Sequence, residues 1–462
     1  MENFWDSNVW GFINLLAILL LSLLIANSLK RKIKFLRYSL IPTSVLGGTI
    51  LLIVAGIYDL FAKTPLFETA FFGYSGYANL EIITYHTLAL GFIASTLKSS
   101  GGKLTKKRSV EIFNTGVTTV STYLLQAVLG FGITLIIANI IAGFFPAAGV
   151  LLPFGFGQGT GQAMNYGNIY ETEYGFAGGK SFGLTIAALG FLSASIGGVI
   201  HLNILKRKNK ITVASENESA IASEQIQAEN EIPMQGSIDK LTIQVAFVIV
   251  AYMLAYILMF VLGNLLPGMK SVIYGFNFLL GVLAATLVKA VINLLRKKKL
   301  MKRTYVNDFL LTRTSNFFFD IMVVAGIAAI RLGVLESYWG IMLILGLVGL
   351  VSTYVYEYYI AKKLFPEYAE EQFLMMYGML TGTASTGTIL LRELDGDFKT
   401  PAADNMVYQN FPAIVFGFPM MLLATLAPQR PYLTFILLVA FFIVMNLILF
   451  RSFIFKKKNK KK

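Results

Sequence analysis

Two short runs rich in glycine and threonine interrupt a chain that otherwise consists of long apolar segments. The first reads Phe-Gly-Phe-Gly-Gln-Gly-Thr-Gly at 154–161, and the second reads Thr-Gly-Thr-Ala-Ser-Thr-Gly-Thr at 381–388. Irregular backbone cannot face lipid, because each unpaired N–H or C=O group there costs several kcal/mol. Such runs are tolerated only inside protein or along a wet cavity. Paired glycine-interrupted segments in the two halves of a chain are typical of the binding site of a secondary transporter.

The composition places the chain in a membrane. Apolar residues make up 56% of the sequence and charged residues only 14%, whereas soluble domains carry about 25% charged residues. The net charge of +14 lies in short clusters between apolar segments, which is typical of cytoplasmic membrane loops and not of nucleic-acid binding. The absence of cysteine and the presence of only two histidines argue against a disulfide framework, a thiolate nucleophile and a metal cluster.

A membrane-spanning helix needs about 20 apolar residues, and the pattern predicts eleven such segments. The stretches 147–170 and 371–394 are too polar and too rich in glycine to span, so we expect both to be re-entrant hairpins. The predicted spans are about 8–29, 39–61, 82–98, 110–146, 181–205, 241–266, 271–295, 309–332, 338–361, 404–427 and 432–455.

The distribution of lysine and arginine predicts the orientation. If the N-terminus lies outside and each span crosses once, every basic cluster falls in the cytoplasm, as the positive-inside rule requires. The same topology makes one hairpin enter from outside and the other from the cytoplasm. The predicted fold is therefore an all-α polytopic membrane protein with two inverted-topology five-helix repeats, each with a re-entrant hairpin, plus one extra C-terminal helix. The basic clusters are 30–37, 98–108, 206–210, 296–303, 362–363 and 456–462.

This interpretation divides the chain into four parts. Residues 1–205 form the first repeat and residues 241–427 the second. Residues 206–240 are polar and poor in aromatic side chains, which predicts a flexible cytoplasmic linker. Residues 428–462 hold the extra helix and a basic cytoplasmic tail. We expect a multi-pass protein of the cell membrane with its C-terminus in the cytoplasm.

The glycine and threonine runs are the predicted substrate site. Glycine lets the backbone approach a ligand, and threonine supplies a hydroxyl without charge. Helix N-termini at a broken segment suit anions, while freed carbonyls suit Na⁺. The alternative for each run is a close helix contact through small residues, and the alternative for Arg392 is a local pair with Glu393 or Asp395. The predicted substrate-binding residues are Gly157, Gln158, Gly159, Thr160, Gly161, Gly382, Thr383, Ser385, Thr386, Gly387, Thr388 and Arg392.

Asp320 lies within an apolar span, where an ionised carboxylate costs about 2.5–3.5 kcal/mol. Asn316 lies one turn earlier on the same helix face, so the two could bind a coupling cation or proton; the alternative is a pair with Arg313. Gln126 is a third candidate for cation coupling, or a packing contact. His86 fits an interhelical hydrogen bond better than a proton relay. We expect Glu357 to extend toward the inner membrane surface.

Five motifs resemble those of the sodium/glutamate symporter family. Ile-Pro-Thr-Ser-Val-Leu-Gly-Gly at 41–48 is similar to a family motif in the second span, and Gln126 opens a similar glutamine and glycine pattern. Residues 157–161 resemble the family's first hairpin tip, with glutamine in place of histidine. Glu-Tyr-Gly-Phe at 173–176 resembles a downstream motif, and 378–388 lies where the family has its second tip. The resemblance implies two inverted halves, two loops meeting at the substrate, Na⁺ coupling and a homodimer.

The predicted function is a cation-coupled secondary transporter, namely Na⁺ symport of glutamate or a related amino acid or small carboxylate by alternating access. The alternatives are a proton-coupled carboxylate transporter and a passive channel. An enzyme is disfavoured because no nucleophile lies beside a base in the sequence and no metal-ligand motif occurs. No phosphate-binding loop motif occurs either, so the driving force must be an ion gradient. The expected ligands are a small anionic amino acid or carboxylate and Na⁺, with no other cofactor.

Overall fold

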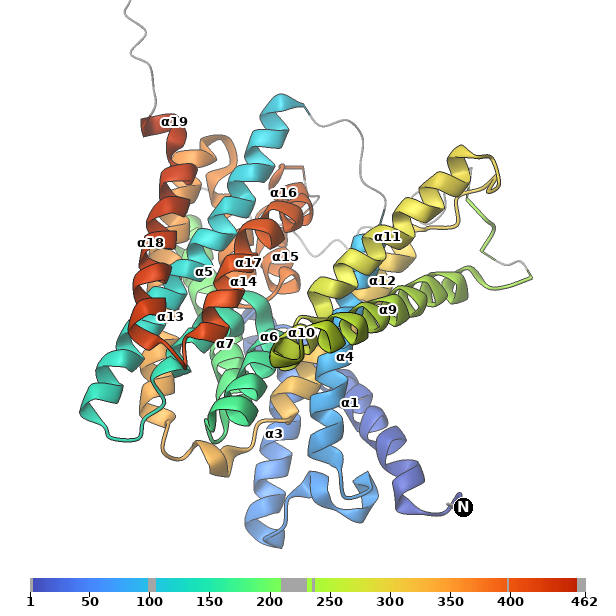
Figure 1. Ribbon diagram of the computed structural model, residues 1–462, viewed down its shortest axis with the longest axis vertical. Helices are drawn as coiled ribbons and strands as arrows, with labels where there is room; N and C mark the ends of the chain where they lie inside the picture. The colour runs from blue at the N-terminus through green and yellow to red at the C-terminus, as the bar shows by residue number, and fades with distance from the viewer. Residues whose placement is uncertain (1–2, 99–104, 209–230, 235–236, 397–398, 455–462) are drawn as a thin grey trace, which may run out of the picture. The chain divides into compact units, whose positions relative to one another are not determined.

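The computed structural model describes residues 3–98, 105–208, 231–234, 237–396 and 399–454 (Figure 1). Within these residues the chain is all-helical and contains no strand, as the sequence predicts. Most of the predicted linker at 206–240 and all of the basic stretch at 456–462 lie outside the described residues, as do residues 99–104 of the basic cluster at 98–108.

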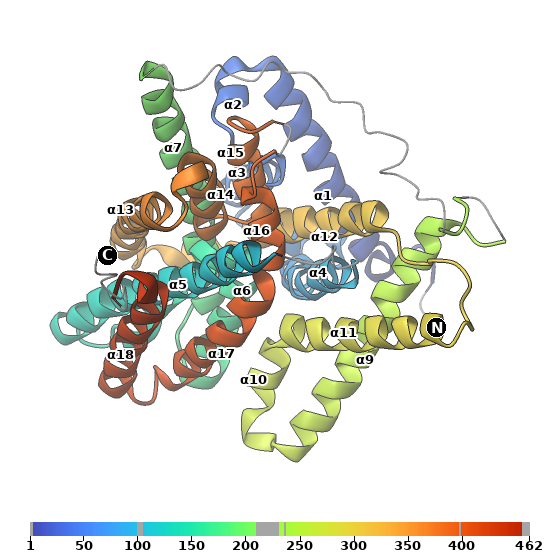
Figure 2. The same ribbon diagram turned by 90° about the horizontal axis from the view of Figure 1, so that it is seen from above.

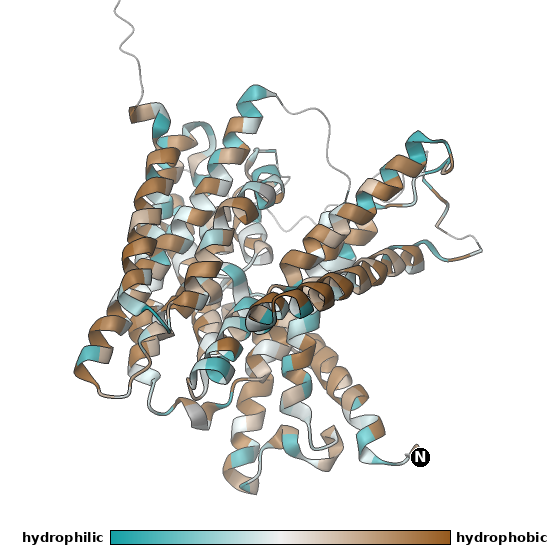
Figure 3. Cartoon of the chain, in the orientation of Figure 1, coloured by the Kyte–Doolittle hydropathy of each residue, from teal (hydrophilic) through white to brown (hydrophobic). Residues whose placement is uncertain are grey.

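Ten helical segments of the described chain are long and apolar enough to cross a membrane, and Figure 3 shows the apolar colour along them. They agree with ten of the eleven predicted spans. The segments are α1 (Ser7–Lys32), α3 (Thr43–Ala62), α4 (Gly76–Leu97, with its entry from Ala70), α5 (Lys106–Ile140), α7 (Gly179–Arg207), α9 (Lys240–Leu265), α11 (Asn277–Lys297), α12 (Asp308–Ala328), α13 (Trp339–Leu364) and α18 (Pro431–Leu449).

The predicted span at 404–427 is bent. It consists of α16 (Ala402–Tyr408) and α17 (Asn410–Leu426), and the two axes meet at 54°. Pro412 lies at the bend and has no amide hydrogen to continue the helical hydrogen bonds across it. Together the two pieces make an eleventh candidate span.

Three of the long helices begin at side chains that cap them. Thr105 accepts a hydrogen bond from the amide of Arg108 at the start of α5, and Asp239 does the same for Leu241 at the start of α9. Asn307 caps α12 through the amide of Leu310. Each cap satisfies an amide that the first helical turn leaves unpaired. The remaining short helices are α2 (Lys34–Tyr38), α10 (Lys270–Gly275) and α19 (Arg451–Ile454), and the 3₁₀ turns are Leu66–Glu68, Ala70–Phe72, Pro146–Val150, Pro267–Met269, Leu332–Leu335 and Pro366–Tyr368.

The chain forms two compact units, and each unit takes segments from both halves of the sequence. The first unit comprises residues 1–26, 46–103 and 215–329, and the second comprises 27–45, 104–214 and 330–462. The first three spans of each half therefore fall mainly in the first unit. The fourth span, the interrupted segment and the fifth span of each half fall in the second unit.

In the first unit, α4 packs against α11 and α12, and α9 packs against α11 (Figure 2). The hydroxyl of Ser315 on α12 donates a hydrogen bond to the Gly91 carbonyl on α4, at 2.9 Å. The ring of Phe92 meets that of Phe319 edge to face. The third spans of the two halves thus form the central pair of this unit.

In the second unit, α5 packs against α13, α17 and α18, while α7 packs against α13 and the interrupted segments. Helices α5 and α13 are the fourth spans of their halves, so they are counterparts in the order of the chain. Their contact surface carries threonine, glutamine and glutamate side chains, which the next section describes.

Candidate substrate and cation site

The first interrupted segment, α6 (Leu151–Tyr174), is a helical hairpin. Gly159 has φ 80° and ψ −172°, a conformation open to glycine but not to residues with a Cβ atom. The rings of Phe154 and Tyr166 stack with their centroids 3.8 Å apart, although about 18 Å would separate these positions along a straight helix. The chain therefore reverses at Gly159, as the sequence predicts for 147–170.

The second interrupted segment is also a hairpin, made of α14 (Ala369–Thr381) and α15 (Ala384–Arg392). Gly382 leaves the helical region with φ −144° and ψ −105°. A Cβ atom on Gly387 would lie 2.4 Å from the Met375 carbonyl oxygen, so the two arms run against each other without space between them. This agrees with the hairpin expected at 371–394.

Both hairpins pack on one helix of the second unit, α7. A Cβ atom on Gly190 would lie 2.5 Å from the carbonyl oxygen of Thr381 and 3.2 Å from the Cα atom of Phe156. Thr381 immediately precedes the break in the second hairpin, and Phe156 lies three residues before Gly159. Gly190 is thus the point where the approach arms of the two hairpins meet.

The tip of the first hairpin contains amide donors without acceptors. The side-chain nitrogens of Gln158 and Gln162 are buried and have no hydrogen-bond partner in the described part of the chain. Asn165 donates to the oxygen of Gln162 at 2.9 Å, and Thr160 is fully buried. A buried donor without a partner costs about 1–3 kcal/mol, so these nitrogens are suited to an acceptor brought by a ligand.

The tip of the second hairpin is lined by hydroxyl groups. The oxygens of Thr383 and Thr386 lie 3.4 Å apart, and Thr386 is fully buried. Thr388 donates to the Ala384 carbonyl within its own helix, at 2.9 Å, and so has less to offer a ligand. The side chain of Ser385 lies outside the part of the chain that the structure describes.

Gln126 on α5 connects the fourth spans to the second hairpin. Its amide nitrogen donates to the Thr353 hydroxyl on α13 and to the carbonyl of Leu380, both at 2.9 Å. Its amide oxygen is buried and has no partner among the described residues. Gln126, a candidate for cation coupling, therefore contacts the second hairpin two residues before the break at Gly382.

The sequence prediction for Glu357 is wrong. Glu357 does not extend to the membrane surface: it is only 1% exposed and accepts a hydrogen bond from the Thr122 hydroxyl of α5. The four-residue spacing of polar side chains on α5 and α13 could have indicated this contact. Thr122 and Gln126 share one face of α5, and Thr353 and Glu357 share one face of α13, because residues four apart lie one above the other.

The remaining predicted residues lie at the far end of α15 or in the first unit. Arg392 ends α15, which places it about 12 Å of helix from the tip at Ala384. Asn316 and Asp320 belong to the first unit and are exposed on α12. Arg313 lies over the ring of Phe309, 5.0 Å from its centroid.

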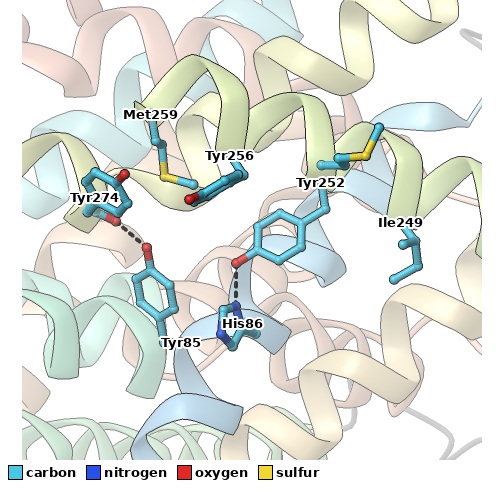
Figure 4. A pocket seen from close by; sticks show the side chains of 8 residues that line it. Tyr85, His86, Ile249, Tyr252, Tyr256, Met259 and Tyr274 are labelled. Carbon is cyan, nitrogen blue, oxygen red and sulfur yellow. Dashed lines mark hydrogen bonds between the residues drawn. The ribbon is translucent and has the colours of Figure 1, made fainter. Parts of the chain in front are cut away.

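The first unit contains a cavity of about 450 Å³ between α4, α9 and α10, which holds none of the predicted site residues (Figure 4). His86 faces Tyr252 across it, with the ring nitrogen Nδ1 2.6 Å from the hydroxyl oxygen, so His86 makes an interhelical hydrogen bond. Tyr85 donates to the Tyr274 carbonyl at 2.7 Å. The lining side chains are Tyr85, His86, Ile249, Tyr252, Met253, Tyr256, Met259 and Tyr274.

A polytopic helical chain whose two hairpins meet beside buried polar groups has the architecture of a membrane transporter. No group of histidine, cysteine and acidic side chains in the described residues could hold a transition metal or zinc. The chain belongs to the sodium/glutamate symporter family, whose sequence profile matches residues 11–369. A search of curated proteins found no match.

Membership of this family makes the protein a Na⁺-coupled transporter rather than an enzyme, and a multi-pass membrane protein. The family match ends at Ala369, the first residue of α14. It therefore covers the first hairpin and stops where the second begins.

Proposed function

We propose that the protein is a Na⁺ symporter for glutamate or a related small anionic amino acid or carboxylate, working by alternating access. The observation that carries this substrate class is the pair of buried amide nitrogens of Gln158 and Gln162, which have no acceptor in the described residues. A carboxylate is an acceptor-only group and would satisfy both. The N-terminus of α15 begins at the second tip and adds a favourable dipole for an anion.

The predicted substrate residues of the two tips are proposed to act together. Gly157, Gly159 and Gly161 bring backbone to the ligand in the first hairpin, and Gly382 and Gly387 do so in the second. The closeness of both approach arms to Gly190 supports a shared ligand. Arg392 is proposed to attract the anion at longer range, since it stands at the other end of α15 from the tip.

The inverted repeat and its orientation are part of this proposal. The equal division of the two halves between the compact units supports an internal repeat, because corresponding spans fall in the same unit. The positive-inside pattern supports an external N-terminus and a cytoplasmic C-terminus. We also propose a homodimer, which a mass measurement on the purified protein would check.

Uptake into vesicles tests the substrate and the driving ion. Purified protein in liposomes should accumulate radiolabelled glutamate or another small acidic substrate when a Na⁺ gradient is imposed, and should not do so with K⁺ in place of Na⁺. A panel of glutamate, aspartate, 2-oxoglutarate, citrate and glutamine separates amino acids from other carboxylates. Flux that equilibrates but never accumulates would indicate a channel, and accumulation driven by a pH gradient alone would indicate proton coupling.

Two variants test the role of the amide nitrogens. Gln158→Leu and Gln162→Leu should each raise the apparent KM for the carboxylate substrate by about 10- to 150-fold, because one hydrogen bond to a charged group contributes roughly 1.5–3 kcal/mol. Gln429→Leu is the matched control, since Gln429 is exposed and its side-chain nitrogen donates to the Tyr174 hydroxyl. An unchanged KM in both tip variants would contradict the assignment.

A further inference from the structure

We infer that Glu357, Thr122, Thr353 and Gln126 form the site where the second unit binds the coupling Na⁺. Two side-chain hydrogen bonds connect α5 with its counterpart α13. The Thr122 hydroxyl donates to Glu357, and the Gln126 amide donates to Thr353. This inference deepens the proposed symport, because it names the residues that hold the cation. It rests on Na⁺ coupling and not on the identity of the substrate.

Burial and charge point to a cation at this place. Glu357 is 1% exposed, and the other three side chains are fully buried. Glu357 makes no ion pair with any basic side chain in the described residues. An ionised carboxylate in such a setting is costly unless a positive charge compensates it. A bound Na⁺ supplies that charge.

The chemistry of the four side chains fits a hard monovalent cation. They offer a carboxylate, two hydroxyls and the amide oxygen of Gln126, which has no partner in the described residues. Hard cations select oxygen ligands of these kinds. Residues four apart are separated by about 6 Å along a helix, so an ion midway between the two hydrogen-bonded pairs lies about 3 Å along the axis from each. The four groups can close around it with small side-chain movements.

The same site is connected to the substrate tip. Gln126 donates from its nitrogen to the Leu380 carbonyl, two residues before the break at Gly382. When its oxygen faces the ion, its nitrogen is held toward Leu380. Binding of Na⁺ therefore orders the end of α14 that leads to the second tip. This gives a direct route by which the cation raises the affinity for the substrate.

Na⁺-dependent thermal stability tests the site without any substrate. The melting temperature of the purified full-length protein is measured against NaCl concentration, with choline chloride holding the ionic strength constant and the pH fixed. In the wild type the melting temperature should rise and saturate with Na⁺. In Glu357→Gln the Na⁺ concentration at half-effect should rise at least about tenfold, because cation affinity follows ligand charge.

Variants of the hydroxyl groups sharpen the test and remain informative if Glu357→Gln does not fold. Thr122→Val and Thr353→Val should each raise the half-effect concentration several-fold, whereas Thr122→Ser, which keeps the hydroxyl, should restore it. The matched control is Glu367→Gln, since Glu367 is an exposed glutamate paired with Lys107. The control should keep the wild-type Na⁺ response.

Four results would overturn the inference. In the first, the wild type shows no stabilisation by Na⁺. In the second, the valine variants and Glu357→Gln keep the wild-type midpoint. In the third, Asp320→Asn loses the Na⁺ response while Glu357→Gln retains it. A change in Glu357→Gln confined to pH dependence, with the Na⁺ midpoint unchanged, would make Glu357 a proton site and also overturn it. If the variants respond as expected but the wild type transports no acidic substrate, the substrate proposal fails and the cation site stands.

Discussion

Gly159 shows how a single residue determines the shape of a binding element. Its φ of 80° with ψ of −172° lies in a region that residues with a Cβ atom rarely enter. The reversal there turns one apolar segment into two arms that meet at the tip. The chemistry of the first hairpin therefore depends on a residue without a side chain.

Gly159→Ala should destabilise the first hairpin by about 1–3 kcal/mol, the cost of a strained backbone at a position over-determined by its surroundings. The expected result is a lower melting temperature together with a higher KM for substrate. Gly340→Ala is the control, because Gly340 lies near the start of α13 with open space around it and no unusual φ. Equal melting temperatures for the two variants would show that the tip tolerates a different turn.

Glu370 stands at the base of the second hairpin, outside the membrane-spanning segments. Its carboxylate accepts hydrogen bonds from His201 Nε2 at 2.9 Å and from Lys362. The hydrogen bond from His201, followed by the contacts with Lys362, lowers the pKa of Glu370 from 4.5 to about 2. A carboxyl group whose pKa is lower in the folded state stabilises that state at any pH above its pKa in the unfolded chain. This stabilisation is lost as the pH falls through the pKa of the folded state.

The stability advantage of wild type over Glu370→Gln should therefore be full above pH 4.5 and should shrink as the pH falls toward about 2. The measurement is the difference in melting temperature between the two proteins across this window. Taking the difference removes the contribution of other carboxyl groups. Glu367→Gln, at an exposed pair, should show a much smaller difference, and a pH-independent gap for Glu370→Gln would contradict the assigned cause.

At the scale of elements, α7 is the helix on which both hairpins rest. Glycines at 183, 190 and 197 recur every seven residues and so share one face, since seven residues make about two turns. Cβ atoms there would lie 2.3 Å from the Ala163 carbonyl oxygen, 2.5 Å from that of Thr381 and 2.1 Å from the Tyr377 hydroxyl. The row contacts the first hairpin at one end, both hairpins in the middle and the second hairpin at the other end.

Gly190→Ala should disturb both hairpins at once, because the nearest atom is a backbone carbonyl that cannot rotate away. We expect a loss of about 1–3 kcal/mol in stability and a larger loss of uptake, since an added methyl in a packed core forces backbone shifts. Gly417→Ala on α17 is the matched control, with its nearest atom, in Val120, at an ordinary 3.8 Å. The two variants are compared by their melting temperatures and by their uptake of substrate. Normal uptake by Gly190→Ala would show that the hairpins do not need this close contact.

At the scale of the whole molecule, the division into two units cuts across the two halves of the sequence. The first unit holds the exposed pair of Asn316 and Asp320, and the second holds both hairpins and the cluster around Glu357. The candidate substrate groups and the inferred cation site thus share one unit. Ordering of α14 by the cation can therefore act on the substrate tip without passing through another unit.

The topology can be measured directly, because the chain contains no cysteine. In intact cells, an impermeant maleimide should label Lys63→Cys, at an exposed position after α3, and should label Lys208→Cys only after the membrane is opened. The reason is the predicted cytoplasmic location of the basic clusters. Labelling of Lys208→Cys from outside would reverse the orientation and reject the inverted repeat as proposed.

The sequence by itself determined the spans, the two hairpins and the family, because these follow from local information. Apolar length specifies a membrane helix, and glycine at 159 and 382 permits a break, whatever the surroundings. The tertiary structure alone decided which side chains meet. Glu357 became a buried partner of Thr122, and Arg392 came to lie at the far end of α15 from the tip. Asp320 fell in the first unit, and Gln126 in the second beside Leu380. The physical reason is that a helix presents several faces, and only packing against its neighbours selects the face that is buried.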